Sequence, residues 1–279
     1  MRYICLLSLA ILLLACTNRQ LEPKDIPISK AERHIVIPEF QAIVDSAGLA
    51  GSIVIYDLTE DRYYSNNFAW ARNGHLPAST FKIPNSIIAL ETGVVEDDST
   101  LFVWGGEKRR LKVWEQDLAF KEAFHHSCVP CYQEVARNIG AARMADYLHR
   151  FNYGNMKVDS GHIDMFWLQG DSRINQLQQI DFLERFYKGD LPISDRTEAI
   201  MKRMMVIEDN EKYKLSGKTG WSVTNGSNNG WFVGFIETQS KVYFLATNVE
   251  PNPQFDMNMF AMIRKDITIT ALKQMQIMY

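Results

Sequence analysis

The sequence predicts an α/β (α+β) fold in which segments from both ends of the chain build one central antiparallel sheet with flanking helices, while the middle forms an inserted all-helical lobe. Strand patterns lie near both ends of the 279 residues and helical periodicity lies between them. Hydrophobic residues make up 46% of the chain, which is enough for a large core. Because the helical stretch interrupts one sheet, the junction of the two lobes is predicted to hold a ligand-binding cleft.

The strands are predicted from apolar and β-branched runs that are bounded by turn residues. Two lie at residues 51–57 and 62–68, and three lie at residues 214–219, 230–237 and 241–248. We therefore assign the sheet lobe to about residues 31–70 and 211–279, and the helical lobe to about residues 71–210. Together they form one domain, 31–279.

The helices are predicted from apolar residues at three- and four-residue spacing and from signals at their ends. Gly93 and Gly140 are expected to end the first two, and Asp195 with Glu198 has the spacing of a capping box. Pro84 removes a backbone donor near the start of the first helix, so its first turn should be distorted. The helices are expected at about residues 79–91, 130–140, 142–151, 175–187, 195–205 and 260–275.

The N-terminus has the pattern of an export signal. Arg2 precedes an apolar run at residues 4–15 that is too short to span a membrane, and Cys16 follows it in a lipobox-like string. We expect residues 1–16 to be a signal peptide with a lipobox, Cys16 to be lipidated and residues 17–30 to be a tether. Cleavage at or just after Ala15 without lipidation is the open alternative. Both interpretations place the mature chain in the periplasm, and lipidation would anchor it to the outer membrane.

Charge and cysteine content narrow the classes of partner. A net charge of -3 gives no reason to expect nucleic acid, and membrane contact is expected only through an N-terminal lipid. Cys128 and Cys131 form a C-x-x-C pair, for which we favour two buried apolar thiols over a disulfide or redox role. The pair lacks a histidine at ligand spacing, so no metal site is predicted.

Four short motifs in one order indicate serine nucleophilic chemistry. They are S-T-F-K at 79–82, S-C-V at 127–129, Y-G-N at 153–155 and K-T-G at 218–220. Ser79 and Lys82 lie three residues apart on one helical face, at an N-terminus that favours negative charge. An isolated S-x-x-K is more often a helix cap beside a solvated lysine. The ordered set instead supplies a hydroxyl, a base, a second proton carrier and a cationic anchor.

Lys82 can be a base at neutral pH only if its pKa is lowered or its amine is modified. Five apolar residues near the motifs could form a dry pocket that favours the neutral amine: Phe81, Val129, Phe166, Trp167 and Leu168. A neutral amine can add carbon dioxide to form a carbamate, and the indole N–H of Trp167 could donate to it. A plain core role for Trp167 is the alternative.

On these motifs, the chain resembles the class D serine β-lactamases, the oxacillinases, from about residue 47 to 275. The resemblance includes the longer strings P-A-S-T-F-K-I-P-N at 77–85, L-E-T-G-V at 90–94 and F-W-L at 166–168. It implies a serine β-lactamase and penicillin-binding-protein transpeptidase-like fold. It also implies hydrolysis of the β-lactam ring of penicillin-type antibiotics through an acyl-serine intermediate, and hence antibiotic resistance.

The resemblance assigns a role to each catalytic residue. Ser79 would form the acyl-enzyme, and Lys82, as N6-carboxylysine, would be the general base, with Trp167 holding the carbamate. Ser127 would carry a proton to the β-lactam nitrogen, supported electrostatically by Lys218. No cofactor is expected apart from carbon dioxide or bicarbonate for this carboxylation.

The resemblance also implies the substrate-binding residues. The substrate carboxylate would bind Thr219 and Arg264, and the backbone N–H groups of Ser79 and Trp221 would form an oxyanion hole. Leu111 and Trp114 match the cleft mouth, with plain packing as an equal alternative. The expected substrate-binding set is Thr219, Gly220, Trp221, Arg264, Val129, Leu168, Leu111 and Trp114.

Two departures and two rival functions remain. Gln169 stands where relatives often have Glu, which leaves Lys82 as the well-placed base, and Cys128 should point away from the cleft. The rivals are a β-lactam sensor domain that acylates without turnover, and a cell-wall transpeptidase or carboxypeptidase. The preference among penicillins, oxacillin, cephalosporins and carbapenems stays open, as does the oligomeric state.

Overall fold

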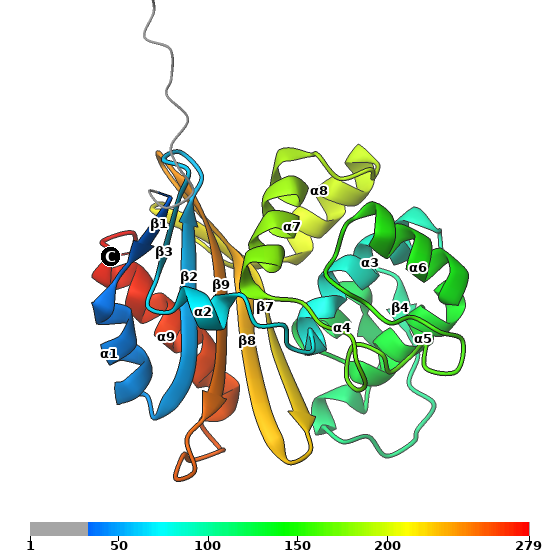
Figure 1. The fold of residues 1–279 in the computed structure, drawn as a ribbon. Helices are drawn as coiled ribbons and strands as arrows, with labels where there is room; N and C mark the ends of the chain where they lie inside the picture. The colour runs from blue at the N-terminus through cyan, green and yellow to red at the C-terminus, as the bar shows by residue number, and fades with distance from the viewer. Residues whose placement is uncertain (1–32, 279) are drawn as a thin grey trace, which may run out of the picture.

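The structure, a computed structural model, describes residues 33–278 and contains one seven-stranded sheet with helices on both faces (Figure 1). The strand order is β1-β3-β2-β9-β8-β7-β6, so strands from both ends of the chain lie side by side, and β2 pairs antiparallel with β9. This confirms the predicted fold class, but the inserted lobe is not all-helical, because residues 101–102 and 118–119 form a short strand pair within it. The strands are β1 (His34–Val36), β2 (Leu49–Asp57), β3 (Arg62–Ser65), β6 (Val206–Asp209), β7 (Tyr213–Thr224), β8 (Ser227–Thr238) and β9 (Val242–Pro251), with β4 (Leu101–Phe102) and β5 (Leu118–Ala119) forming a separate pair.

Helices lie on both sides of the sheet, and most of them form the inserted lobe (Figure 1). The expected helices are present, and their ends differ from the predicted ones by at most three residues. Those of the described residues are α1 (Pro38–Ser46), α2 (Phe68–Ala71), η1 (Ala78–Phe81), α3 (Lys82–Glu91), η2 (Lys112–Trp114), α4 (Phe120–His125), α5 (Val129–Ile139), α6 (Ala141–Arg150), α7 (Gln176–Lys188), α8 (Asp195–Met204) and α9 (Phe260–Gln274).

Alternation along the strands divides the core into two parts. On β2, Ile53 and Ile55 pack with α1 and α9 on one face of the sheet. Val54 and Tyr56 point to the other face and join the core that the sheet shares with α7 and the helical lobe. A sheet buried on both faces holds its strands in a fixed register, and this fixes where the residues of β7 meet the inserted lobe.

Several predicted boundaries were wrong for local reasons. Phe68 belongs to α2 because Asn67 caps that helix by accepting from the Trp70 N–H, so β3 ends at Ser65. The cap of α8 is Ser194 rather than Asp195. Strand β1 pairs parallel with β3, and β6 joins the sheet before the predicted lobe boundary at residue 211.

A hairpin fills the stretch between the predicted strands at 214–219 and 230–237, and both strands are longer than predicted. Strands β7 and β8 pair continuously up to Thr224 and Ser227. Asn225 and Gly226 alone make the turn, both with positive φ (51° and 80°). The part of β7 that begins at Lys218 is therefore paired with β8 up to its last residue.

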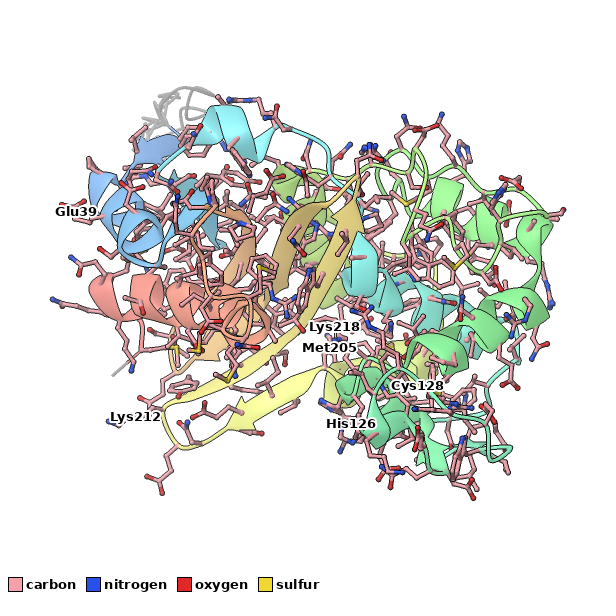
Figure 2. All side chains as sticks on the ribbon, turned by 90° about the horizontal axis from the view of Figure 1, so that it is seen from below. Glu39, His126, Cys128, Met205, Lys212 and Lys218 are labelled. Carbon is pink, nitrogen blue, oxygen red and sulfur yellow. A yellow bond between two sulfur atoms is a disulfide. The ribbon has the colours of Figure 1, made fainter. Side chains whose placement is uncertain are left out.

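The end of α8 meets β7 at the junction of the two lobes. The Gly217 N–H donates to the Met205 carbonyl at 2.9 Å, and Figure 2 shows Met205 beside Lys218. Beyond this contact β6 no longer covers β7, so from Lys218 onward the edge of β7 faces the helical lobe.

The proposed signal peptide, Cys16 and the tether lie outside the described residues. Between residues 33 and 278, no helix is long and apolar enough to cross a membrane.

The first turn of the helix that begins near Ser79 is distorted, as expected. Residues Ala78–Phe81 form a 3-10 turn, and the α-helix begins only at Lys82. Ala78 has a φ of 50°, which is uncommon for a residue with a side chain. Its N–H donates to the Trp167 carbonyl at 2.9 Å, which fixes the entry to the turn.

The Y-G-N motif supports this turn through a chain of buried hydrogen bonds. The Tyr153 hydroxyl donates to Gln179 Oε1 at 3.2 Å, and Gln179 Nε2 donates to Thr80 Oγ1 at 3.0 Å. Thr80 Oγ1 in turn donates to the Pro77 carbonyl at 2.6 Å. Burial raises the pKa of Tyr153, so the hydroxyl keeps its proton and remains a donor.

Position 154 requires a glycine, because its backbone φ is positive and there is no room for a Cβ atom. Its φ is 61°, and a Cβ atom there would lie 2.7 Å from the Arg173 carbonyl oxygen. Asn155 and Arg173 exchange backbone hydrogen bonds of 2.8 and 2.9 Å, so this neighbour cannot easily move. Gly93 has a similar φ of 68° but nothing within 4 Å.

We expect Gly154→Ala to lower the free energy of unfolding by about 3 kcal/mol or more, because conformational strain and a backbone collision add. Gly93→Ala is the matched control and should cost about 1–2 kcal/mol, from strain alone. Urea denaturation of both variants measures the difference. Equal losses would show that the collision at Gly154 is relieved by a backbone shift.

Candidate active site

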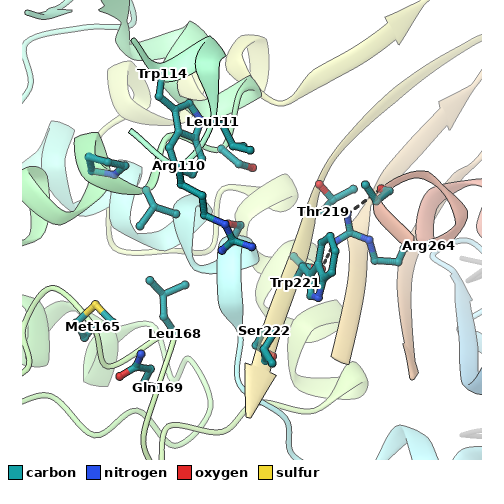
Figure 3. Close-up of a pocket in the computed structure, with 17 residues that line it drawn as sticks. Arg110, Leu111, Trp114, Met165, Leu168, Gln169, Thr219, Trp221, Ser222 and Arg264 are labelled. Atoms are coloured by element: carbon teal, nitrogen blue, oxygen red, sulfur yellow. Dashed lines mark hydrogen bonds between the residues drawn. The ribbon is translucent and has the colours of Figure 1, made fainter. Parts of the chain in front are cut away.

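A cavity of about 670 Å³ lies between the sheet and the helical lobe (Figure 3). Of the predicted catalytic residues, Ser79 and Ser127 line it, while Lys82, Trp167 and Lys218 are buried outside its lining. All eight predicted substrate-binding residues line it, including Leu111 and Trp114. The lining residues are Ser79, Arg110, Leu111, Trp114, Ser127, Val129, Pro130, Met165, Leu168, Gln169, Thr219, Gly220, Trp221, Ser222, Val223, Ala261 and Arg264.

The nucleophile candidate and its base are in contact. Lys82 Nζ lies 3.2 Å from Ser79 Oγ, as the three-residue spacing predicts. The Lys82 side chain is 1% exposed, and its Nζ lies 4.8 Å from the centre of the Tyr132 ring. Burial, followed by the nearby charge of Lys218, holds the pKa of Lys82 well below its usual range. This lowering of the pKa favours the neutral, basic form of the amine.

Trp167 is part of the apolar wall beside the nucleophile turn. Its ring stacks on Phe81 with centroids 5.2 Å apart, and Phe166 packs edge-on against both rings. Among residues 33–278, the indole Nε1 has no hydrogen-bond acceptor. The indole N–H of Trp167 is therefore an unused donor next to the turn that carries Ser79.

Ser127 and Lys218 form a second pair across the lobe junction. Lys218 Nζ donates to Ser127 Oγ and also reaches the Thr219 carbonyl at 3.3 Å. Burial, and then the charge of Arg264, lowers the pKa of Lys218 to about 7. The pair can thus exchange a proton near neutral pH.

The backbone at Ser127 is held in an unusual conformation. Its φ is 52°, and the carbonyl of the preceding residue, His126, accepts from Trp114 Nε1 at 2.9 Å. Trp114 thus fixes the turn that presents Ser127 as well as lining the cavity.

Two backbone N–H groups are free to bind an oxyanion. Among the described residues, the Ser79 N–H has no acceptor, because the first turn of η1 leaves it unbonded. The Gly217 N–H points to the open edge of β7, and N–H direction alternates along a strand, so the Trp221 N–H points to the same edge. Donors from two different elements therefore face the cavity, which is the arrangement of an oxyanion hole.

Arg264 provides a cationic wall opposite the helical lobe (Figure 3). Its guanidinium donates to the Phe260 and Ala261 carbonyls at 2.8 Å each and to the Gly220 carbonyl. These bonds use three of its five N–H groups, which leaves two for a ligand beside Thr219. Burial lowers its pKa to about 10, so it remains charged at neutral pH.

The interpretation of Cys128 and Cys131 as free thiols was wrong. They form a disulfide, with both residues almost fully buried and Cα atoms 5.4 Å apart. Cys128 is the N-cap of α5, and its Sγ accepts the Cys131 N–H at 3.3 Å. The first turn of a helix brings positions i and i+3 close together, so the two cysteines can form a disulfide. The C-x-x-C spacing alone allows this bond but does not require it. Cys128 points away from the cavity, as expected.

Arg110 lines the cavity although no motif predicts it, and its signal in the sequence is its place next to Leu111 in a basic run. The second S-x-V of the chain, at Ser52, has a structural role, because Ser52 Oγ is hydrogen-bonded to Ser65 Oγ inside the sheet at 2.9 Å.

Within residues 33–278, no group of three or more His, Cys, Asp or Glu could hold a metal ion.

Comparison with known proteins gives consistent matches. Residues 55–273 match the family described as the penicillin binding protein transpeptidase domain. The β-lactamase OXA-48 of Klebsiella pneumoniae is 40% identical over 227 residues, which cover 81% of this chain and 84% of that protein. The crystal structure of a class D β-lactamase from Sebaldella termitidis superposes with a TM-score of 0.83 at 34% identity, covering 88% of this chain and 100% of that one.

A regulatory protein is also similar. The regulatory protein BlaR1 of Bacillus licheniformis is 29% identical over 76% of this chain. The match covers only 35% of that protein, so this chain is similar to one part of it.

We expect the double variant Cys128→Ala, Cys131→Ala to unfold with a free energy about 2 kcal/mol lower than the wild type, because a four-residue loop is no longer closed. Denaturant titration without reductant gives this value, and the reduced wild type is the control that should match the variant. Alkylation of unreduced, denatured protein followed by peptide mapping should label neither cysteine. Labelling of both would contradict the disulfide.

Proposed function

Because this chain belongs to the class D serine β-lactamases, we propose that it hydrolyses the β-lactam ring of penicillin-type antibiotics through an acyl-enzyme on Ser79 and thereby confers resistance. The observation that carries the proposal is the contact of 3.2 Å between Ser79 Oγ and the buried amine of Lys82, beside the cavity and two free N–H donors. A nucleophile, a base of lowered pKa and an oxyanion hole are the parts that acyl transfer needs.

In acylation, a carbamate oxygen on Lys82 accepts the hydroxyl proton of Ser79 as Oγ attacks the β-lactam carbonyl carbon. The carbonyl oxygen becomes negative and is stabilised by the N–H groups of Ser79 and Trp221. The substrate carboxylate binds the two free N–H groups of Arg264 and the hydroxyl of Thr219. This charge pairing orients the ring over the nucleophile.

Ring opening needs a proton on the departing nitrogen. Ser127 Oγ can donate this proton and regain one from Lys218, whose pKa of about 7 suits it to both accept and release a proton. The ring C–N bond breaks and the acyl group stays on Ser79.

Deacylation needs a base to activate water. Lys82 fits carboxylation because its amine is buried and neutral, and Trp167 has an indole N–H without an acceptor. A carbamate on Lys82 would supply an oxygen base, so carbon dioxide is the only cofactor that we propose. Gln169 lines the cavity but has no proton-accepting carboxylate, so it offers no second base.

We also propose that the protein acts in the periplasm and that Cys16 is lipidated. This rests on the sequence pattern of residues 1–16. A periplasmic position would place the enzyme between incoming β-lactams and their targets.

Steady-state turnover of a chromogenic cephalosporin tests the function. The wild type should turn over many equivalents, and Ser79→Ala should show neither turnover nor an acyl adduct by intact mass. Ser160→Ala is the control, because Ser160 is exposed and does not line the cavity. A single stoichiometric burst from the wild type, with a stable adduct on Ser79, would contradict hydrolysis and favour a sensor. An adduct on Ser79→Ala would contradict the nucleophile.

A further inference from the structure

A basic loop before η2 places one guanidinium in the cavity. Arg110 lines the cavity, and in Figure 3 its side chain extends from the side of Leu111 and Trp114 toward the β7 wall that carries Trp221 and Ser222. Between residues 33 and 278, Arg110 makes no hydrogen bond or ion pair with another residue. An arginine with five free donors that points into a binding cavity is available to a ligand.

The carboxylates near Arg110 are already engaged. Glu107 binds the Arg109 guanidinium, with Nε 2.6 Å from Oε1. Glu115 accepts from Lys112 Nζ at 2.6 Å. Asp117 accepts the backbone N–H of Trp104 at 2.7 Å. All three carboxylates of this loop therefore bind other partners, and none of them pairs with Arg110.

The cavity as a whole has an excess of positive charge. Among the lining residues that the structure describes, two are arginines, Arg110 and Arg264, and none is an aspartate or glutamate. Lys218, also on β7, is buried with its Nζ 3.3 Å from the carbonyl of Thr219, which lines the cavity. The ring carboxylate of the substrate would pair with Arg264. It supplies one negative charge, which leaves the positive charge of Arg110 without a partner.

The chemistry of the substrate indicates what meets Arg110. In a penicillin the ring carboxylate and the acylamino side chain lie at opposite ends of the bicyclic nucleus. With the carboxylate at Arg264 and the reacting carbonyl at Ser79, the side chain extends away from Arg264, toward the wall of Leu111, Trp114 and Arg110 (Figure 3).

We propose that Arg110 is a specificity residue that binds a second anionic group, carried on the acyl side chain of the substrate, so that penicillins with a side-chain carboxylate gain in kcat/KM over those with a neutral or cationic side chain. This inference rests on the proposed β-lactam hydrolysis. The ring carboxylate is common to all penicillins, so its contact with Arg264 does not distinguish one penicillin from another. The contact with Arg110 depends on the charge of the acyl side chain and therefore does distinguish them.

Three penicillins with the same phenylacetyl core test the proposal: carbenicillin with an α-carboxylate, benzylpenicillin with hydrogen and ampicillin with an α-ammonium group. In Arg110→Gln, kcat/KM of carbenicillin relative to benzylpenicillin should fall about fivefold, as expected for losing a solvent-accessible ion pair. The value for ampicillin relative to benzylpenicillin should rise about twofold or more. High salt should reduce both effects.

Lys108→Gln is the matched control, because it removes the same charge from the same loop at a position that does not line the cavity. It should leave both ratios within twofold of the wild type. The proposal is overturned if Arg110→Gln leaves both ratios unchanged. It is also overturned if Lys108→Gln changes them equally, because the effect would then come from the overall positive charge of the loop and not from a contact with Arg110. Absence of benzylpenicillin turnover by the wild type would instead overturn the proposed function, and this inference with it.

Discussion

Three basic side chains, Lys82, Lys218 and Arg264, are buried around the cavity that Ser79 lines, and no carboxylate among the described residues pairs with them. The charge of Arg264 lowers the pKa of Lys218, and the charge of Lys218 lowers that of Lys82. Burial is the larger cause for both lysines. The site therefore holds two amines that lose their protons easily next to one guanidinium that keeps its charge. An anionic substrate or a carbamate would relieve the excess of positive charge.

This arrangement costs stability, and the rest of the structure offsets that cost. The pKa of Lys218 is about 7 when folded and near 10.5 ordinarily. Between these values the unfolded chain binds a proton that the folded protein does not, so stability falls as the pH falls through this window and is constant below it. Two hydrophobic cores, one on each face of the sheet, supply the stability that a strained, charged site lacks. The chain from Tyr153 to Thr80 then fixes the nucleophile turn.

Most of the site could be predicted from sequence because its central contacts are local or follow from strand alternation. The distance between Ser79 and Lys82 follows from helical spacing, and the open edge of β7 follows from the pairing of the C-terminal strands. Other features depend on packing between distant segments. The direction of Arg110 is set by a loop with no regular period, and the C-x-x-C spacing fits a disulfide as well as two thiols. The turn at Asn225 and Gly226 did have a sequence signal, an Asn-Gly pair between strand patterns, which was overlooked.

The central claim is that burial keeps the amine of Lys82 neutral and thus able to form a carbamate. Carbon-13 NMR of the protein in labelled bicarbonate tests this directly. We expect one carbamate resonance in the wild type that is absent in Lys82→Ala, weaker in Trp167→Phe, which has no indole N–H, and lost on acidification as the amine becomes protonated. A wild type that shows no such resonance at saturating bicarbonate, yet hydrolyses β-lactams at its full rate, would contradict the account.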